Sequence, residues 1–421
     1  MPINLFERFS DIKKVSNEVV MKETILITSN AYFPNIGGVE NSLKYLADSY
    51  VKLGFNVIVV VSDVSPDSSE LPFEEFAVDT TIYRYSTFKK MKSVGKYFRS
   101  IRSAFCAWKL LKSLNKNNNI TLTLSRFHTA TLLAKLAKLP NIVYLVPGVV
   151  KNQNSQENLI RGYGIKRIKL QLSLVLHHFL QKLALKHCDK VLVFSHNMAR
   201  QITDISPTNT HLPVTKPGVD PTRFHPVKDK ASLKTTYKIP NNKTVLLTVG
   251  RFVRAKGFDL VIDAMTKLPE CHLVMVGDGE NIEQIRQQIV DNNLGAQVTL
   301  TGSQKDTSPY YQLADIFLMS SRYEPLGQTI LEGLSSGLPI VAFKGSGVVT
   351  ATQELLSEKE AIYTANINAD GLVDCILKLI NDANLMAEMG SLGRNIAVTR
   401  FSWLALAQHI LDYRCDEPKH S

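Results

Sequence analysis

The chain of 421 residues is longer than one ordinary hydrophobic core supports, so the sequence predicts two domains. Hydrophobic residues make up 44% of it and charged residues 21%, which excludes a disordered or fibrous chain and is typical of a globular protein. Its five cysteines are far apart and form no CxxC pair, so neither a disulfide framework nor a cysteine metal site is expected.

The net charge of +11 lies entirely in the first half of the chain. Residues 1–220 carry 29 lysines and arginines against 16 acids, whereas residues 221–421 carry 20 against 22. Two segments, 88–116 and 160–188, hold nine and six basic residues and no acid. Because apolar and aromatic residues alternate with these charges at near-helical spacing, the pattern favours basic amphipathic helices on an anionic membrane surface. A solvated helical face is the alternative, and no nucleic acid is expected because no recognition module accompanies the charge.

The first predicted unit runs from strand to glycine-containing turn, helix and second strand. TILITSN (24–30) is typical of a buried strand, the turn AYFPNIGGVE (31–40) follows, and an amphipathic helix is expected at 41–54 before a strand at 55–63. This order opens a doubly wound parallel sheet. Further strands in this half are predicted at 81–86, 120–125, 141–146 and 190–195.

A change in composition separates the two halves. Residues 212–243 hold five prolines and many polar residues, which marks a connection between domains. Beyond it, short runs of Val, Ile and Leu again indicate a parallel sheet covered on both faces. The strands of this second half are predicted at 244–250, 272–279, 297–302, 315–321 and 339–343. We therefore predict an α/β protein with Rossmann-like domains at 1–220 and 244–400, a linker at 221–243 and a terminal helix within 401–421.

Two cations follow the first strand of the second half. Arg251 and Lys256 lie just beyond the strand end, and Gly257 then opens a helix. An arginine can bind phosphate oxygens in bidentate fashion and a lysine as a point charge, so this arrangement favours a diphosphate site next to a helix N-terminus. Solvent-exposed loop cations are the alternative.

Two carboxylates stand eight positions apart in SSRYEPLGQTILEGLSSGLPIVAFKGSG (320–347). Gly327 and Gln328 are expected at the first turn of a helix, where free backbone N–H groups face an anion. Glu332 lies about one turn further and can accept hydrogen bonds from a ribose diol. Glu324, in the turn, lies where a sugar attached to the diphosphate would sit. Each carboxylate alone is equally consistent with a helix-start acid or a solvated helix residue.

Four segments together resemble the family 4 retaining glycosyltransferases of the GT-B fold, the group 1 glycosyltransferases. EPLGQTILEGLSSGLPIVA resembles their E-x7-E signature, GRFVRAKGFD their G-R-x(n)-K-G element, and VTKPGVDPTRFHP (214–226) their interdomain motif. PNIGGVE (34–40) is similar to their N-terminal glycine loop. The resemblance extends over residues 22–412 and implies two Rossmann-like domains facing each other across a cleft, with the helix at 401–414 crossing back to the first domain.

The resemblance also assigns roles to single residues. It implies that Arg251 and Lys256 stabilise the departing nucleoside diphosphate, that Glu332 holds the ribose, and that Glu324 lies near the donor sugar and its anomeric carbon. Catalytic roles are thus expected for Arg251, Lys256 and Glu324. The other expected donor-binding positions are Gly37, Gly38, Gly277, Gly327, Gln328 and Thr329. Since the sequence has no D-x-D motif, neither a metal nor another cofactor is expected.

One position departs from the family pattern. Many relatives have a histidine at the end of the strand predicted at 141–146, where this chain has Pro147 beside Gly148. His128, at the end of the preceding strand, is a candidate for the acceptor side, although a lone histidine is more often structural.

The implied function is transfer of a hexose from a UDP- or GDP-sugar to a glycan or lipid-linked acceptor, in polysaccharide or lipopolysaccharide biosynthesis. No signal peptide is expected, because residues 1–23 lack a basic start followed by an apolar core. The protein is expected in the cytoplasm, peripherally at the inner face of the membrane. A nucleotide-sugar epimerase or phosphorylase of the same fold, or a non-catalytic scaffold that binds nucleotide sugars, are the alternatives.

Overall fold

The computed structural model describes most of the chain. The described residues are 22–35, 37–65, 71–77, 79–88, 95–153, 165–208, 212–324, 326–344 and 348–414. Several sequence-based predictions extend beyond them: the N-terminal stretch 1–21, positions 89–94 and 160–164 of the two basic segments, Ile36 of the glycine loop, Pro325 and positions 345–347 of the stretch 320–347, and positions 415–421 of the C-terminal segment.

The first domain is built on a seven-stranded sheet that is parallel except at one edge. In spatial order the strands are β3 (Glu74–Ala77), β4 (Thr80–Tyr85), β2 (Asn56–Ser62), β1 (Thr24–Thr28), β5 (Ile120–Ser125), β6 (Ile142–Leu145) and β7 (Lys190–Leu192). Six of them coincide with predicted strands. The antiparallel edge strand β3 was missed, because EEFA offers neither an apolar run nor an alternation of polarity.

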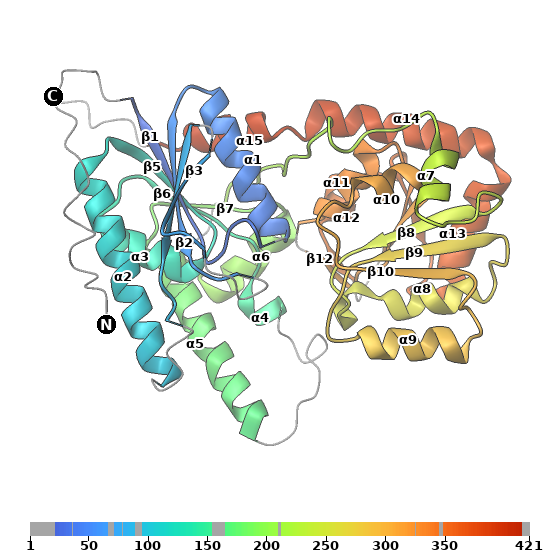
Figure 1. The fold of residues 1–421 in the computed structure, drawn as a ribbon, viewed down its shortest axis with the longest axis horizontal. Coiled ribbons are helices and arrows are strands. Elements are labelled where there is room, and N and C mark those ends of the chain that lie inside the picture. Colours follow the sequence, from blue (N-terminus) through green and yellow to red (C-terminus); the bar gives the residue numbers. More distant parts are fainter. Residues whose placement is uncertain are drawn as a thin grey trace.

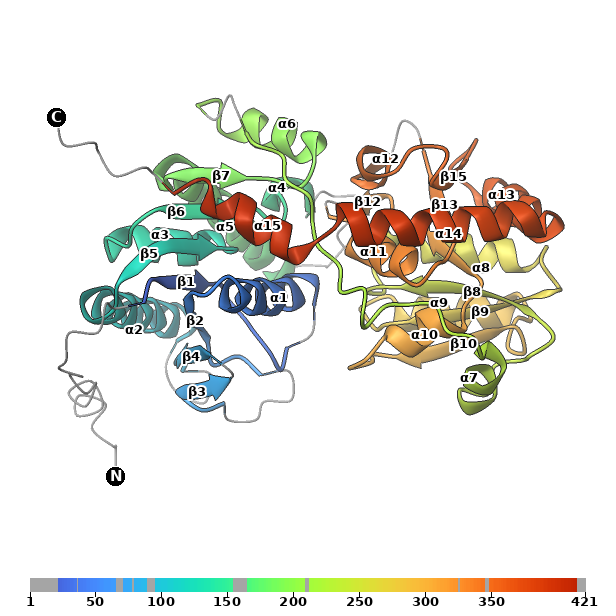
Figure 2. The ribbon, with the colours of Figure 1, turned by 90° about the horizontal axis from the view of Figure 1, so that it is seen from above.

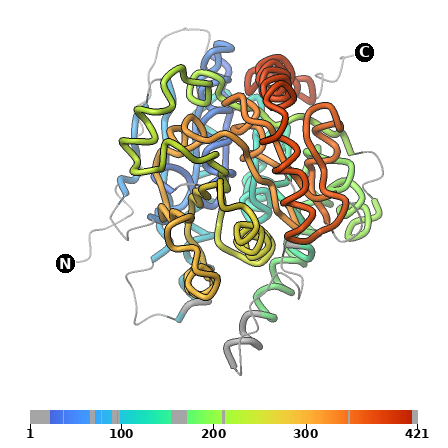
Figure 3. Tube along the Cα trace, turned by 90° about the vertical axis from the view of Figure 1, so that its right-hand side faces the viewer, coloured from blue at the N-terminus to red at the C-terminus, as the bar shows by residue number. Residues whose placement is uncertain are grey.

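Helices cover both faces of this sheet (Figure 1). On one face α1 (Gly38–Lys52) packs its Leu43 and Leu46 against Ile25 and Val59. On the other face lie α2 (Lys96–Asn117) and α3 (His128–Leu136), and α5 (Ile165–His187) packs beside α3. Figures 1 and 3 show α5 extending away from the rest of the molecule. The helices α4 (Val150–Gln153) and α6 (His196–Ile205) follow β6 and β7.

The second domain has a six-stranded sheet in which all neighbouring strands are parallel. In spatial order the strands are β10 (Val298–Gly302), β9 (Cys271–Val276), β8 (Thr244–Val249), β11 (Ile316–Met319), β13 (Ile340–Phe343) and β15 (Ala361–Thr364). Two short strands, β12 (Tyr323–Glu324) and β14 (Val349–Thr350), form a separate parallel pair. Every strand predicted for this half is present, whereas β12, β14 and β15 were missed.

Both faces of the second sheet are also covered. One core contains side chains of α8 (Phe258–Met265), α9 (Ile282–Asp291) and α13 (Ala369–Asn381). The core on the opposite face contains side chains of α10 (Ser308–Leu313), α11 (Gln328–Ser335) and α14 (Ala383–Arg400). The remaining short elements are the 3-10 helix η2 (Arg254–Lys256), α7 (Lys230–Thr236) and α12 (Thr352–Leu355). Two doubly wound domains are therefore present, as predicted.

The C-terminal helix returns to the first domain, which confirms that prediction (Figure 2). After α14 the chain crosses over, and α15 (Trp403–Leu411) packs on α1. The Trp403 ring stacks on Tyr45 with centroids 5.4 Å apart. A side chain at Gly218 would overlap the same indole ring, so the crossing requires glycine there. The linker limits at 221–243 stay a prediction; the short helix α7 falls within them and packs beside α10.

None of the helices in the described part of the chain combines the length and the apolar character that crossing a bilayer requires.

Candidate active site

A buried ion pair lies where strands of the second domain end. Lys256, the last residue of η2, donates a hydrogen bond from Nζ to Oε2 of Glu324 in β12. The two side chains are only 18% and 11% exposed, so little solvent separates or screens them. The fold thus brings together two of the predicted catalytic residues, which are 68 positions apart in the chain.

The environment of Glu324 keeps its carboxylate ionised. Burial alone would raise its pKa, but the ammonium of Lys256 and the backbone N–H groups of Gly327 and Leu326 outweigh burial and hold the pKa below its ordinary value. The Gly327 and Leu326 N–H groups donate to Oε1 of Glu324 at 3.2 and 3.4 Å. Positive and negative charge are therefore fixed side by side in a nearly dry site.

The turn after Glu324 opens the N-terminus of α11. Gly327 has φ +76°, a left-handed conformation that favours glycine, and as N-cap residue it offers no side chain to the first-turn N–H groups. The hydroxyl of Thr329 in that turn is buried without a hydrogen-bond partner among the described residues. Gln328 instead donates from Nε2 to the carbonyl of Gly218 at 3.1 Å, so its amide connects α11 with the crossing between the domains. This helix N-terminus is suited to an anion.

Glu332 lies in the same helix and is also buried. Burial raises its pKa to about 7, against the lowering effects of Tyr311 and Arg223. Tyr311 donates its hydroxyl hydrogen to Oε2 of Glu332 at 2.8 Å. Arg223 itself donates to the Tyr45 hydroxyl in the first domain at 3.3 Å and to Asp306 in the second at 2.9 Å. The predicted ribose-binding carboxylate therefore lies beside a link between the domains.

Sequence reasoning missed Tyr311, Arg223 and Tyr45. The sequence offered a signal for Arg223, because this residue lies in the segment VTKPGVDPTRFHP that carries the family resemblance. Tyr311 and Tyr45 lie in helices whose patterns predict only packing, and their spacing to Glu332 exists only in the folded chain.

Arg251 and Gly277 lie at the ends of neighbouring strands. The side chain of Lys256 passes over Gly250, the residue directly before Arg251. If Gly250 carried a β-carbon, that atom would lie 3.3 Å from Cε of Lys256. Arg251 is exposed, and its backbone carbonyl accepts a hydrogen bond from the N–H of Val253 at 2.9 Å. A side chain at Gly277 would overlap the carbonyl of Gly250, so this glycine allows the two strand ends to approach. A direct contact of either residue with a donor stays a prediction.

The two glycines of the first domain differ. Gly38 begins α1, and a β-carbon there would have no atom within 4 Å, so its backbone is open to approach. A β-carbon on Gly37 would overlap the carboxylate of Glu40. The structure therefore leaves Gly38 accessible and covers Gly37 with a side chain of the same helix.

His128 is buried against another histidine. Its Nε2 lies 2.9 Å from Nδ1 of His177 in α5, and Phe127 packs against both rings. Burial, reinforced by His177, lowers the pKa of His128 to about 4, so the ring is neutral at pH 7. These contacts fasten α5 to α3. The acceptor role of His128 stays a prediction.

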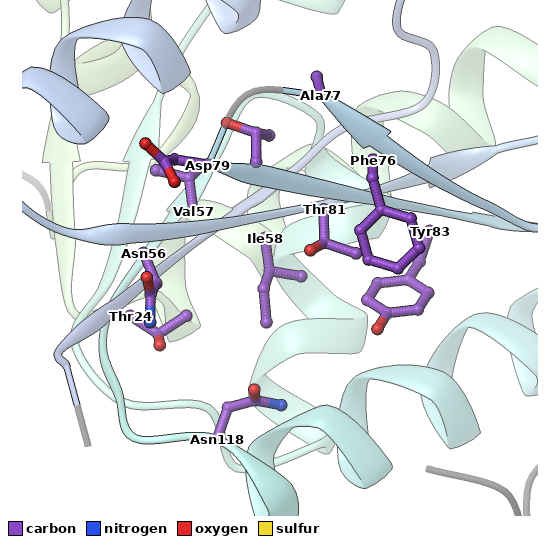
Figure 4. A pocket seen from close by; sticks show the side chains of 11 residues that line it. Thr24, Asn56, Val57, Ile58, Phe76, Ala77, Asp79, Thr81, Tyr83 and Asn118 are labelled. Atoms are coloured by element: carbon purple, nitrogen blue, oxygen red, sulfur yellow. The ribbon is translucent and has the colours of Figure 1, made fainter. Parts of the chain in front are cut away.

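A depression of about 350 Å³ lies elsewhere, at the amino ends of strands in the first sheet (Figure 4). Thr24, Asn56 and Thr80, which begin β1, β2 and β4, contribute to its wall. It contains no lysine or arginine, and the residues described above follow the carboxyl ends of strands. It therefore has no part in the candidate site. In the described residues no group of His, Cys, Asp or Glu is arranged to hold a metal ion.

Two family models match consecutive parts of the chain. The model for group 1 glycosyl transferases matches residues 229–396, and the model for glycosyltransferase family 4 matches residues 36–223. The two matches meet near the predicted linker and together include both domains.

Curated relatives support the same family. The chain is 31% identical over 191 residues, 45% of its length, to the lipopolysaccharide core biosynthesis glycosyltransferase LpsE of Rhizobium meliloti. It is 27% identical over 241 residues, 54% of its length, to mannosylfructose-phosphate synthase of Agrobacterium fabrum. It is 28% identical over 211 residues, 47% of its length, to a GDP-mannose-dependent phosphatidylinositol monomannoside mannosyltransferase of Mycobacterium tuberculosis. The matches span about half the length of these relatives, namely 54%, 52% and 54%.

Solved structures share the whole fold. Sucrose-phosphate synthase of Thermosynechococcus elongatus superposes with a TM-score of 0.74 at 20% identity, covering 93% of this chain and 98% of that one. Anabaena HepE in complex with UDP and glucose gives a TM-score of 0.70 at 18% identity, covering 92% and 98%. With both family models matched in the expected order and the fold shared end to end, the chain belongs to the group 1, family 4 glycosyltransferases, and its two domains form the GT-B fold.

Proposed function

We propose that this protein is a retaining hexosyltransferase that uses a nucleoside-diphosphate sugar and needs no metal. The observation that carries the proposal is the buried Lys256–Glu324 pair beside the uncapped N-terminus of α11. The Lys256 ammonium and the α11 N–H groups would stabilise the diphosphate as it leaves, where negative charge develops, with Arg251 reaching in from the exposed strand end. The ionised Glu324 would face the positive charge that develops at the anomeric carbon.

The remaining residues would position the substrates. Glu332 would accept hydrogen bonds from the ribose hydroxyls, and Gly38 would allow the backbone of the first domain close to the donor. The acceptor hydroxyl would attack from the face that the diphosphate leaves, so that the configuration is retained. The presence of two glutamates does not by itself support the double-displacement mechanism of retaining hydrolases. That mechanism needs a carboxylate nucleophile, whereas the charge of Glu324 is already paired with Lys256.

The names of similar proteins support a proposal for the substrate class. One relative is GDP-mannose-dependent and acts on a phosphatidylinositol monomannoside, and one structural neighbour holds UDP and glucose. We therefore propose a UDP- or GDP-hexose donor and a glycan or lipid-linked acceptor, in polysaccharide or lipopolysaccharide synthesis at the cytoplasmic membrane face. An epimerase of this fold would turn over the donor without an acceptor, a phosphorylase would require inorganic phosphate, and a scaffold would bind the donor without turnover.

Replacing Lys256 tests the proposal. We expect Lys256→Ala to lower kcat about a hundredfold, as the loss of one preorganised donor to a developing oxyanion does. Donors are first identified by calorimetry with UDP, GDP, ADP and their sugars, and sugar transfer is then followed by mass spectrometry of the acceptor. The matched control is Lys267→Ala, which removes an exposed lysine paired with Asp370 at the surface of the same domain. Near-normal kcat in Lys256→Ala, with the control also normal, would refute the role of Lys256.

Chelation tests the absence of a metal from the mechanism. Since fixed cations and helix N–H groups supply the positive charge in the proposed mechanism, transfer rates should be the same with and without excess EDTA. Activity that EDTA abolishes and a divalent ion restores would contradict this mechanism.

The pH dependence of donor binding tests Glu332. Ribose hydroxyls donate hydrogen bonds to the ionised carboxylate, whose pKa in the unliganded protein is about 7. Binding should therefore be strongest above that pH, and the Kd of a nucleotide sugar should rise toward about tenfold per unit below it. Tyr311→Phe removes a hydrogen bond that lowers the pKa of Glu332. The pH below which the Kd begins to rise should therefore be higher in this variant.

Calorimetry across pH measures this effect, and Tyr310→Phe, which changes the neighbouring residue of α10, serves as control. The nucleotide sugar is chosen because its phosphates do not titrate in this range. A Kd that is independent of pH between 5.5 and 9 would show that Glu332 does not bind the donor in the ionised form.

The helical face formed by α2 and α5 supports the membrane part of the proposal. Helix α3 contacts both of them, so the two basic helices lie on one side of the first domain. Lys109 and Lys112 of α2 lie over the rings of Phe105 and Trp108. Large apolar side chains of both helices are exposed: Phe98, Ile101, Phe105, Leu172, Val175, Leu176 and Phe179. Exposed apolar residues among cations are suited to an anionic lipid surface, whereas a merely solvated face would not need them.

Vesicle binding tests this face. The protein should sediment with phosphatidylglycerol vesicles, less so as salt rises, and weakly with phosphatidylcholine vesicles. The double variant Ile101→Glu/Val175→Glu should lower binding about tenfold or more, because it removes apolar contact and adds negative charge. Val290→Glu, at an exposed position of α9, is the matched control. Equal binding to both vesicle types, or no effect of the double variant, would exclude this face as the docking surface.

A further inference from the structure

The N-terminus of α6 in the first domain is capped by a carboxylate of the second. The backbone N–H groups of His196 and Asn197 donate to Oε2 and Oε1 of Glu354, the latter at 2.7 Å. Ser195, the N-cap residue, accepts from the N–H of Met198 at 3.1 Å. Three of the four N–H groups that a helix start leaves free are thus satisfied, two of them across the domain boundary.

The capping carboxylate belongs to the same unit as the candidate active site. Glu354 lies in α12, which begins directly after Ala351, and the N–H of Ala351 donates to the backbone carbonyl of Glu324 at 2.8 Å. The neighbouring Leu355 packs on the turn at Gly327. A β-carbon added to Gly327 would lie 3.3 Å from Cδ1 of Leu355. Strands β12 and β14 join these parts by their parallel pairing. Helix α12, the β12–β14 pair and the turn that opens α11 therefore form one connected unit, which we call the active-site unit.

The helix that receives the cap is fixed in the first domain. Met198, Ile202 and Ile205 are buried in a core cluster with residues of β6 and β7. A second side chain of the active-site unit reaches the same helix, since the Tyr323 hydroxyl donates to Oε1 of Gln201 at 3.4 Å. Figure 2 shows α6 and α12 on the same side of the molecule, on either side of the domain boundary.

We propose that Glu354 is a positioning residue: by capping α6 it sets the observed arrangement of the two domains and thereby the place of the donor-side turn relative to the first domain. We call this pair of hydrogen bonds the α6 cap. A carboxylate suits the position because two N–H groups and the positive end of the helix dipole face it. Glu354 is exposed, so the bonds compete with water and can open for substrate exchange. The link to catalysis rests on the proposed function, whereas the link to the domain arrangement does not.

Backbone substitution separates the cap from other roles of these residues. Proline at His196, the first residue of α6, removes one of the two N–H groups and is tolerated at a first helical position. The preceding Ser195 has φ −154° and ψ 151°, the extended backbone that a residue before proline adopts. His196→Ala keeps the N–H group and is the control for the side chain. Glu358→Gln removes an exposed charge paired with Lys344 and is the control for Glu354→Gln.

The test uses the full chain and two measurements. By small-angle scattering without substrates, Glu354→Gln and His196→Pro should each increase the radius of gyration, while His196→Ala and Glu358→Gln should not. In sugar transfer Glu354→Gln and His196→Pro should each lower kcat/KM roughly tenfold, because a smaller fraction of the protein is in the competent arrangement. The double variant Glu354→Gln/His196→Pro should be no worse than the stronger single variant, because both remove one interaction.

Three results would overturn the proposal: unchanged scattering in both single variants, additive losses in the double variant, or an equal effect of His196→Ala. An increase in the radius of gyration confined to the cap variants would support the α6 cap even if the wild-type protein transferred no sugar. In that case the proposed function alone would fail.

Discussion

The site depends on keeping a carboxylate charged in a place that water barely reaches. Glu324 stays ionised because Lys256 and two backbone N–H groups are fixed around it. Removing one member of a buried ion pair typically costs about 3–5 kcal/mol, so neither residue can be exchanged without disturbing the turn. Charges held in this way need no rearrangement when a substrate develops charge of its own. The pair is thus both part of the scaffold and a candidate for the chemistry.

The parallel sheet is what makes this arrangement possible. Each strand ends at the same edge, so η2 after β8 and the turn after β11 meet although many residues separate them. Gly257, where a β-carbon would overlap the carbonyl of Ser320, and the left-handed turn at Gly327 allow these ends to come together. Links between the domains then meet the same edge, through Arg223, Gln328 and Glu354. The proposed donor site and these contacts between the domains therefore lie at one edge of the second sheet.

The sequence predicted the two domains and most sheet strands, because apolar runs carry that information, and its motifs placed Lys256 and Glu324 in one site without predicting that they pair. It could not predict contacts that depend on the final distance between distant segments. Tyr311 reaches Glu332 from another helix, and Glu354 reaches α6 across 158 positions of the chain. The short strand pair β12–β14 also escaped prediction, since two residues per strand leave no periodicity to read. Burial of His128 against His177 depends likewise on tertiary packing.

The return of α15 has a consequence for how the chain can be divided. Trp403, Leu406 and Ile410 belong to the same core cluster as Ile25 and Val59, so part of the interior of the first domain comes from a segment that follows the second domain in the chain. A break in the chain at the linker would therefore not yield two independently folding domains. The amino-terminal piece would lack α15, and the apolar side chains of α1 that Trp403 and its neighbours cover would be exposed.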